Sequence, residues 1–263
     1  MRFGLSTRIL WERSVVEALE IIARCGYTAA EVWTEHLWRT GEKAKRVGKR
    51  GQELGLELSL HAPFYDLNIT SINPGIRELS LRQALQSLEL AGRLGARVVV
   101  LHPGRMSSGK DRREEFWPRL EEAMAAIEEK AAEQGVSVGV ENMEQRRLEF
   151  FVRPADLRRL FSLNWSRVGL TLDLAHAATV SSPGRYIAEI EGGWIVHTHL
   201  SDSRAGRVHL PLGKGDLDVK AILAALQQKY HGLVIIEGYV PGRGEEVAAH
   251  DIEFLRNLGF MPH

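Results

Sequence analysis

The sequence VVVLH at residues 98–102 is a short apolar run that ends in a histidine, and five further runs have the same form. They are LSLH, VGVE, GLTLD, IVHTH and VIIE, which end at His61, Glu141, Asp173, His199 and Glu237. Successive runs end 26 to 41 residues apart, which leaves room for one helix and two loops. The pattern predicts parallel strands separated by helices. Because a closed barrel directs the carboxyl ends of its strands to one face, the six side chains should share one site.

The rest of the chain follows the same alternation. Eight strands are predicted, at Arg2–Ser6, Ala29–Trp33, Leu56–His61, Arg97–His102, Val136–Glu141, Val168–Asp173, Ile195–Leu200 and Leu233–Glu237. Helical spacing and capping residues predict helices at about Ser14–Gly26, Gly41–Leu54, Arg77–Leu94, Arg113–Gln134, from Pro154 onward, Val219–Tyr230 and Glu245–Asn257. We therefore predict a single α/β domain over residues 1–263, a (β/α)8 barrel. A doubly wound open sheet is the alternative, and the count of eight favours closure.

The composition is that of one globular domain. The chain has 263 residues, 44% of them hydrophobic, and its 34 basic and 34 acidic residues give a formal net charge of zero. No global field attracts nucleic acid or an anionic membrane, although a local basic rim could still hold a phosphate backbone. The single cysteine, Cys25, cannot form an internal disulfide, and no apolar run reaches transmembrane length. We expect a cytoplasmic protein without membrane spans, either a monomer or a homo-oligomer.

Four of the strand ends carry side chains suited to a divalent metal. Glu141, Asp173, His199 and Glu237 end neighbouring predicted strands. Three carboxylates and one imidazole suit Mn²⁺, Mg²⁺ or Co²⁺, and Zn²⁺ is also compatible. The alternative is a buried hydrogen-bond network without metal. Because four such residues coincide at strand ends, we expect a metal site.

Four further histidines should lie near this group. His61 and His102 could hold a second metal or bind substrate hydroxyls, or each could pair with a carboxylate in a structural role. His176, three residues after Asp173, could join the metal or contact substrate, with an exposed loop position as the alternative. His209 lies in the loop sequence VHLPLGKG, where a site role and a surface role are both open. These residues extend the candidate site beyond the four strand-end ligands.

Other side chains at the mouth of the predicted barrel have weaker signals. Arg204 and Arg207 could bind a substrate phosphate or carboxylate, although surface arginines are common. His197 is expected to face away from His199 and to pack against a helix. Tryptophans that could stack on a sugar, or pack in the core or rim, are Trp11, Trp33 and Trp38.

Seven segments of the chain match one superfamily. They are HAPFYDLN (61–68), VVLHPG (99–104), GVENM (139–143), SRVGLTLDLAHA (166–177), HTHLSDS (197–203), HLPLGKGDLD (209–218) and VIIEGY (234–239). The chain thereby resembles the xylose isomerase-like TIM barrel superfamily, which unites sugar isomerases and epimerases with the endonuclease IV-like abasic-site nucleases. The likeness spans most of the chain and implies a TIM barrel. It is specific for the superfamily and not for one reaction.

The resemblance to sugar epimerases implies one divalent ion held by the four strand-end ligands. It also implies that Glu141 and Glu237 are catalytic and move a proton at the carbon beside a carbonyl. Return of the proton to the other face of that carbon gives epimerisation, and return to the neighbouring carbon gives aldose–ketose isomerisation. His176 then corresponds to a histidine that orients the substrate.

The resemblance to endonuclease IV implies instead up to three zinc ions and DNA as the partner. Eight positions match its ligands: His61, His102, Glu141, Asp173, His176, His199, His209 and Glu237. A ninth ligand, an aspartate two residues before the loop histidine, is Arg207 here, and a cation should weaken the third metal. Phe64 and Tyr65 could act as a wedge in a duplex.

The leading expectation is a metal-dependent isomerase or epimerase that acts on a small sugar, polyol or keto-cyclitol. The alternatives are a zinc-dependent abasic-site phosphodiesterase, a metal-dependent dehydratase or lyase on the same barrel, and a protein that binds sugar without turnover. The sequence leaves open which sugar is bound and which of Mn²⁺, Zn²⁺, Mg²⁺ or Co²⁺ is used.

Overall fold

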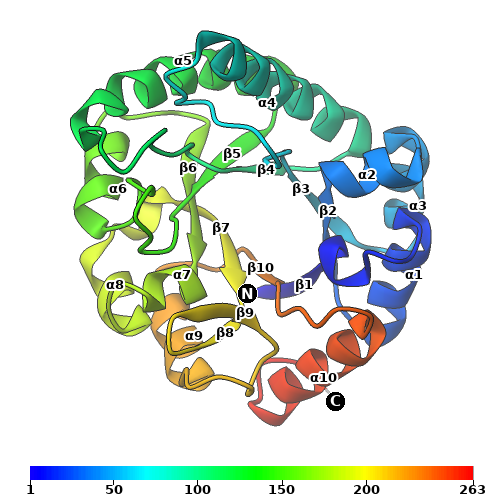
Figure 1. Ribbon diagram of the computed structural model, residues 1–263. Coiled ribbons are helices and arrows are strands. Elements are labelled where there is room, and N and C mark those ends of the chain that lie inside the picture. The colour runs from blue at the N-terminus through cyan, green and yellow to red at the C-terminus, as the bar shows by residue number, and fades with distance from the viewer. Residues whose placement is uncertain (263) are drawn as a thin grey trace.

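Residues 1–262 are described by the computed structural model, and eight parallel strands form a closed barrel at its centre (Figure 1). The pairing joins each barrel strand to the next one along the chain, and the last pairs with the first. The predicted (β/α)8 barrel is therefore confirmed, and the alternative of an open sheet is excluded. The barrel strands are β1 (Arg2–Ser6), β2 (Ala29–Trp33), β3 (Glu57–His61), β4 (Val98–Leu101), β5 (Ser137–Glu141), β6 (Val168–Asp173), β7 (Ile195–Leu200) and β10 (Leu233–Ile236).

Helices surround the barrel on its outer face (Figure 1). They are α1 (Val15–Cys25), α2 (Thr34–Thr40), α3 (Ala44–Glu53), α4 (Pro74–Leu94), α5 (Trp117–Gln134), α6 (Pro154–Phe161), α7 (Leu174–Ala178), α8 (Pro183–Glu189), α9 (Val219–Gln227) and α10 (Gly244–Asn257), with 3-10 turns at Thr7–Leu10, Arg113–Glu115 and Gly192–Trp194. The first helix begins where predicted, because the Ser14 hydroxyl accepts from the Glu17 N–H and the Glu17 carboxylate accepts from the Ser14 N–H. Gly26, with φ of 99°, ends it.

Three loop regions contain structure that the sequence pattern does not indicate. Helix α2 follows β2 directly, so the helix predicted at 41–54 is the second of two in that unit. Helices α7 and α8 follow β6, where only the strand was predicted. The expected polar loop after β7 contains an antiparallel hairpin of β8 (Asp202–Arg204) and β9 (Arg207–Leu210). All three lie at the carboxyl ends of strands, where they help to build the site.

The inside of the barrel changes from apolar to polar along the strands. Ala29, Leu233 and Ile235 form a separate apolar cluster. Side chains two residues apart on a strand share a face, so Glu31 and Glu237 stand on the inward face one step beyond Ala29 and Ile235. The apolar cluster thus fills the barrel interior on the amino-terminal side of the polar residues.

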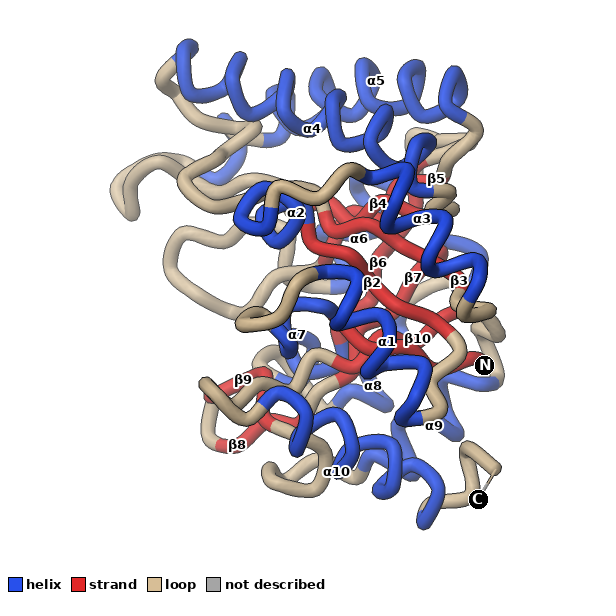
Figure 2. Tube along the Cα trace, turned by 90° about the vertical axis from the view of Figure 1, so that its right-hand side faces the viewer, coloured by secondary structure: helices blue, strands red, loops and turns tan. Residues whose placement is uncertain are grey.

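The two ends of the barrel differ in what they carry. In Figure 2 the β8–β9 hairpin and the long loops lie at the left end, whereas the N-terminus lies at the right end. The six strand-end residues predicted as ligands belong to the loop-rich end, where barrels of this type place their active sites. Among the helices of residues 1–262, none combines the length and the hydropathy that a membrane crossing needs.

Candidate metal centre

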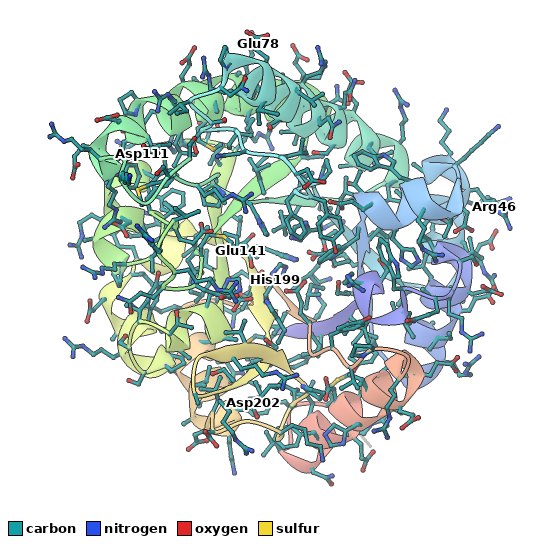
Figure 3. All side chains as sticks on the ribbon, in the orientation of Figure 1. Arg46, Glu78, Asp111, Glu141, His199 and Asp202 are labelled. Atoms are coloured by element: carbon teal, nitrogen blue, oxygen red, sulfur yellow. The ribbon has the colours of Figure 1, made fainter. Side chains whose placement is uncertain are left out.

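Four residues from neighbouring strands converge at the loop-rich end of the barrel. One ligand atom from each of Glu141, Asp173, His199 and Glu237 lies within 4.8 Å of the other three. The Nδ1 atom of His199 is 3.2 Å from Glu141 Oε1 and 3.1 Å from Glu237 Oε2. In Figure 3, Glu141 and His199 lie near the centre of the ring, whereas Arg46 lies at its rim. The fold thus brings together the four side chains that the sequence grouped.

Three buried oxygens of this group lack a hydrogen-bond partner within residues 1–262. They are Oε2 of Glu141, Oδ2 of Asp173 and Oε1 of Glu237. A buried carboxylate oxygen is costly unless a donor or a cation satisfies it. Three carboxylates and an imidazole form the oxygen-rich set that suits a divalent ion. The unsatisfied oxygens and the donor set therefore both fit a divalent metal.

Asn142 braces the ends of β5 and β6 beside this group. Its side-chain amide donates to the Asp173 carbonyl at 3.0 Å, and its Oδ1 accepts from the Asp173 N–H at 2.8 Å. The Asp173 carboxylate accepts from the His176 N–H at 2.7 Å and caps α7, while His176 Nδ1 donates to the Asn142 carbonyl at 2.9 Å. These bonds fix Asp173 and His176 next to Glu141. Asn142 was missed by the strand-end pattern because it follows the ligand in GVENM.

The two glutamates of the group differ in their affinity for a proton. Burial disfavours the charged form of Glu141, but the nearby His199, His102 and His61 outweigh burial and hold the pKa of Glu141 well below its usual range. Burial raises the pKa of Glu237 to about 8, although the charge of His199 opposes the rise. At neutral pH one carboxyl is therefore ionised and the other favours its protonated form.

A cavity of about 280 Å³ opens beside these residues. Glu141 and Glu237 line it, whereas Asp173 and His199 are fully buried and lie outside the lining. The volume is just below the roughly 300–1,000 Å³ of typical small-molecule sites, which suits a small ligand. Two carboxylates of the group therefore face the cavity. The remaining lining includes Trp33, Phe64, His61 and His102.

His61 and His102 lie against Glu141 at the edge of the group. Their Nε2 atoms are 3.8 Å and 3.2 Å from Glu141 Oε2. The Nδ1 of His61 donates to the Ala62 carbonyl at 2.8 Å, which leaves the Nε2 of neutral His61 as a free acceptor or ligand. The three ligand atoms are close enough to hold a metal ion. This contact suits both earlier interpretations, a second metal and a histidine paired with a carboxylate.

His176 and His209 meet on the loop side of the cavity. Their Nε2 atoms are 3.2 Å apart, and His176 Nε2 is 3.7 Å from Glu144 Oε1. His209 has φ of 57°, a strained conformation for a residue with a side chain. Glu144, His176 and His209 form a third metal-capable group. We expected Arg207 to deprive this position of an acidic ligand, but Glu144 supplies a carboxylate that the sequence pattern did not indicate.

The two arginines expected at the mouth lie on the β8–β9 hairpin and do not line the cavity. Arg204 donates to Asp216 at 2.9 Å on the surface, and Arg207 is exposed on β9. Neither belongs to the described residues that line the cavity, whereas Arg105 and Arg146 do. These latter arginines were missed because they follow strand ends by several residues and have no regular spacing from the ligands.

His197 and Glu31 form a buried pair that the sequence did not reveal. His197 Nε2 lies 2.9 Å from Glu31 Oε2, and both residues are fully buried. The expectation that His197 faces away from His199 is wrong, because residues two apart on a strand share a face. The signal for Glu31 was a lone charge in the apolar strand AAEVW.

Known proteins show the same fold. An uncharacterized protein of Methanocaldococcus jannaschii is 28% identical over 251 residues, which cover 90% of this chain and 83% of that protein. A solved structure described as a D-tagatose 3-epimerase-like protein is 26% identical, with a TM-score of 0.83 over 98% of this chain and 97% of the other. A D-psicose 3-epimerase solved in the presence of D-fructose shares the fold at 18% identity, with a TM-score of 0.84 over 99% and 100% of the two chains.

The D-tagatose 3-epimerase-like protein and a protein described as probable endonuclease 4 are both similar to this chain, each at 26% identity. Residues 19–258 match the family described as xylose isomerase-like TIM barrel. That range contains the four-residue group and the whole lining of the cavity. The chain belongs to the xylose isomerase-like TIM barrel family.

Proposed function

We propose that this protein is a divalent-metal-dependent sugar isomerase or epimerase. One observation carries the proposal: Glu141 and Glu237 both line the small cavity, and both reach Nδ1 of the same histidine, His199. Two carboxyl groups that face one ligand are suited to removing and returning a proton. The substrate class is a ketose or a related polyol ketone of monosaccharide size.

We place one divalent ion at Glu141, Asp173, His199 and Glu237. The unsatisfied oxygens of Asp173 and Glu237 and the Nδ1 of His199 are the atoms that fit it. Such an ion would polarise the substrate carbonyl and stabilise the negative charge that develops when the neighbouring carbon loses a proton. Three oxygen donors and one nitrogen favour Mn²⁺, Mg²⁺ or Co²⁺, and Zn²⁺ also fits.

The two glutamates supply the proton chemistry. Glu141 and Glu237 both line the cavity, so one of them can take the proton from the carbon beside the carbonyl while the other returns a proton to the substrate. Return to the opposite face of the same carbon inverts that centre, and return to the former carbonyl carbon exchanges ketose for aldose. The side chains of Glu141 and Glu237 are 2% and 9% exposed, which limits the access of water to the transfer.

The relatives support the same class of reaction. The D-tagatose 3-epimerase-like protein shares 26% of aligned residues and nearly the whole barrel with this chain. The D-psicose 3-epimerase was solved in the presence of D-fructose, a ketose. These likenesses favour a ketose as the first substrate to test.

Solvent proton exchange tests the proposal directly. The protein is incubated with Mn²⁺ or Co²⁺ and a panel of ketoses and inositol-like ketones in D₂O, and deuterium at the carbon beside the carbonyl is measured by NMR. We expect exchange that chelation abolishes, and a loss of about 10²–10⁴-fold in Glu237→Gln. The control is Asp251→Asn, which changes a buried carboxyl outside the cavity. Exchange by Glu237→Gln at the parent rate would show that the assigned proton transfer is wrong.

One observation favours an abasic-site nuclease as the second candidate. Three groups that could each hold a metal surround the cavity: the four strand-end ligands, His61 with His102 and Glu141, and Glu144 with His176 and His209. Three zinc ions per chain together with nicking of an abasic duplex would establish this function. A single bound metal and no nicking would exclude it. Loss of water from a keto-cyclitol in the same screen would instead assign dehydratase or lyase chemistry.

A further inference from the structure

Glu31 is a carboxylate buried inside the barrel, beneath the four-residue group. It lies on β2 and has no exposed surface. Its Oε2 accepts from the Ser59 hydroxyl at 3.1 Å and lies 2.9 Å from His197 Nε2. The same Oε2 accepts from His199 Nε2 at 3.4 Å, and Oε1, which has no hydrogen-bond partner within residues 1–262, lies 3.1 Å from that nitrogen. A buried charge persists only where such partners compensate the loss of hydration, so the contacts of this carboxylate with its partners determine what it can do.

The contact with His199 decides which of its nitrogens can bind a metal. An ionised carboxylate only accepts hydrogen bonds, so the His199 Nε2 that faces Glu31 carries the hydrogen. In the neutral imidazole the free lone pair then belongs to Nδ1. That atom faces Glu141 Oε1 at 3.2 Å and Glu237 Oε2 at 3.1 Å. Glu31 thus selects the tautomer in which His199 presents a lone pair to the other three ligands.

We propose that Glu31 is a positioning residue for the metal centre, which acts by accepting the Nε2 hydrogen of His199 and committing Nδ1 to the cation. This role rests on the proposed metal site and deepens it. Carboxylates that hold the second nitrogen of a metal-bound histidine fix the ring and raise its basicity, and their loss typically costs about 10–100-fold in metal affinity. Glu31 adds a negative charge below the cation without contacting it.

Ser59 and His197 hold Glu31 in this orientation. Both contact Oε2, which also accepts from His199 Nε2 at 3.4 Å. His197 does not belong to the four-residue group, so its contribution is to Glu31 rather than to the cation. Three partners on Oε2, and none on Oε1 within residues 1–262, make the carboxylate asymmetric.

This asymmetry makes Glu31→Gln a sharp test. The amide oxygen of the substituted side chain would occupy the position of Oε2, because Ser59 and His197 both donate there. The amide NH₂ would then face His199 Nε2 and drive the hydrogen of the ring to Nδ1, the atom that the cation needs. The side chain keeps its size, so the barrel interior keeps its packing.

The experiment titrates the full chain with Co²⁺, followed by calorimetry and by the visible spectrum of the bound ion. Long-range ¹H–¹⁵N NMR of the metal-free protein, recorded above the raised pKa of His199 so that its ring is neutral, reads the tautomer of His199. We expect Glu31→Gln to bind Co²⁺ about 10–100-fold more weakly, with an altered spectrum and the hydrogen on Nδ1. The matched control is Asp251→Asn, which makes the same change from carboxyl to amide in a buried side chain outside the cavity, and its affinity should stay within about twofold of the parent.

A second variant keeps the test decisive if Glu31→Gln does not fold. Glu31→Asp retains the charge but withdraws it from His199, so its Co²⁺ affinity should fall between those of the parent and the Gln variant. Folded Glu31 variants that bind Co²⁺ within twofold of the parent would overturn the role.

A parent that binds Co²⁺ but exchanges no ketose proton would refute the proposed reaction and leave this inference standing. Loss of a deeper ion held by Glu31, His197 and His199, seen as a fall from two Co²⁺ to one, would also overturn it.

Discussion

The two sides of the cavity differ in chemistry. The carboxylate side consists of Glu141, Asp173, His199 and Glu237 at the ends of β5, β6, β7 and β10. The aromatic side consists of Trp33, His61, Phe64 and His102, whose rings pack on one another with centroids 4.8 Å apart for Trp33 and His61 and 4.4 Å apart for Phe64 and His102. Charge is concentrated on one side and flat apolar surface on the other.

This difference separates two tasks. The carboxylate side can hold a cation and move a proton, because three carboxyl groups and an imidazole meet there and two of the carboxyl groups line the cavity. The aromatic side can contact the C–H faces of a sugar, because Trp33 and Phe64 offer ring surface to the cavity. Changes on the first side should therefore lower kcat, and changes on the second should raise KM.

The largest effect is expected from Asp173→Asn on the carboxylate side. Asp173 has no exposed surface and one unsatisfied oxygen, so the substitution removes a charged ligand from a buried site. Mn²⁺ affinity should fall by more than about 100-fold, since direct ligands matter at least as much as the groups that orient them. Calorimetric titration measures this, with Asp251→Asn as the control. Unchanged Mn²⁺ affinity would remove Asp173 from the proposed metal site.

A smaller effect of a different kind is expected from Phe64→Leu on the aromatic side. Phe64 lines the cavity and packs on His102. Loss of the ring should raise KM about tenfold, which corresponds to about 1.4 kcal/mol of binding, and change kcat less than about threefold. Steady-state kinetics of the ketose identified by proton exchange separate the two constants. A fall in kcat with unchanged KM would contradict the division of tasks between the two sides.

A buried carboxyl outside both sides should affect stability rather than turnover. Burial raises the pKa of Asp251 to about 8, far above its ordinary 3.8. Between these values the folded chain keeps a proton that the unfolded chain releases, so the free energy of unfolding falls as pH rises through this window. Asp251→Asn should remove up to about 1.4 kcal/mol of that fall per pH unit. Urea denaturation from pH 4 to pH 9 measures the free energy of unfolding of the parent and of the variant. Parallel pH profiles of the two proteins would contradict the assigned role of Asp251.

The smallest effect is expected from Arg207→Ala. Arg207 is exposed on the β8–β9 hairpin and does not line the cavity. Substitution should change ketose exchange less than about twofold, as is usual for surface positions. A tenfold loss of exchange would instead show that the hairpin closes over the substrate and that the arginine contacts it.

The sequence was most informative about features that the local sequence of a single strand or helix end determines. The runs ending at Glu141, Asp173 and His199 predicted both the strands and the meeting of their last residues, because parallel strands must deliver their carboxyl ends to one face. The capping sequence at Ser14 predicted the start of α1 for the same reason, since its partners lie within one turn. Features fixed by local spacing were therefore predictable.

Features that depend on contacts across the barrel were not predictable from one strand. Glu31 on β2 meets His197 on β7, a partner 166 residues away. Glu144 reaches His176 from a loop, which no strand periodicity indicates. His197 was misplaced through an error of strand parity, and the correct parity would have put it beside His199. The hairpin of β8 and β9 was missed because its strands are too short for an alternating pattern.

Anomalous diffraction from a crystal soaked in Mn²⁺ tests the shared-cation site most directly. The account predicts one strong peak, about 2.0–2.4 Å from carboxylate oxygens of Glu141, Asp173 and Glu237 and from Nδ1 of His199. A map with no peak among these four side chains, or with its only peak between His176 and His209, would contradict the account.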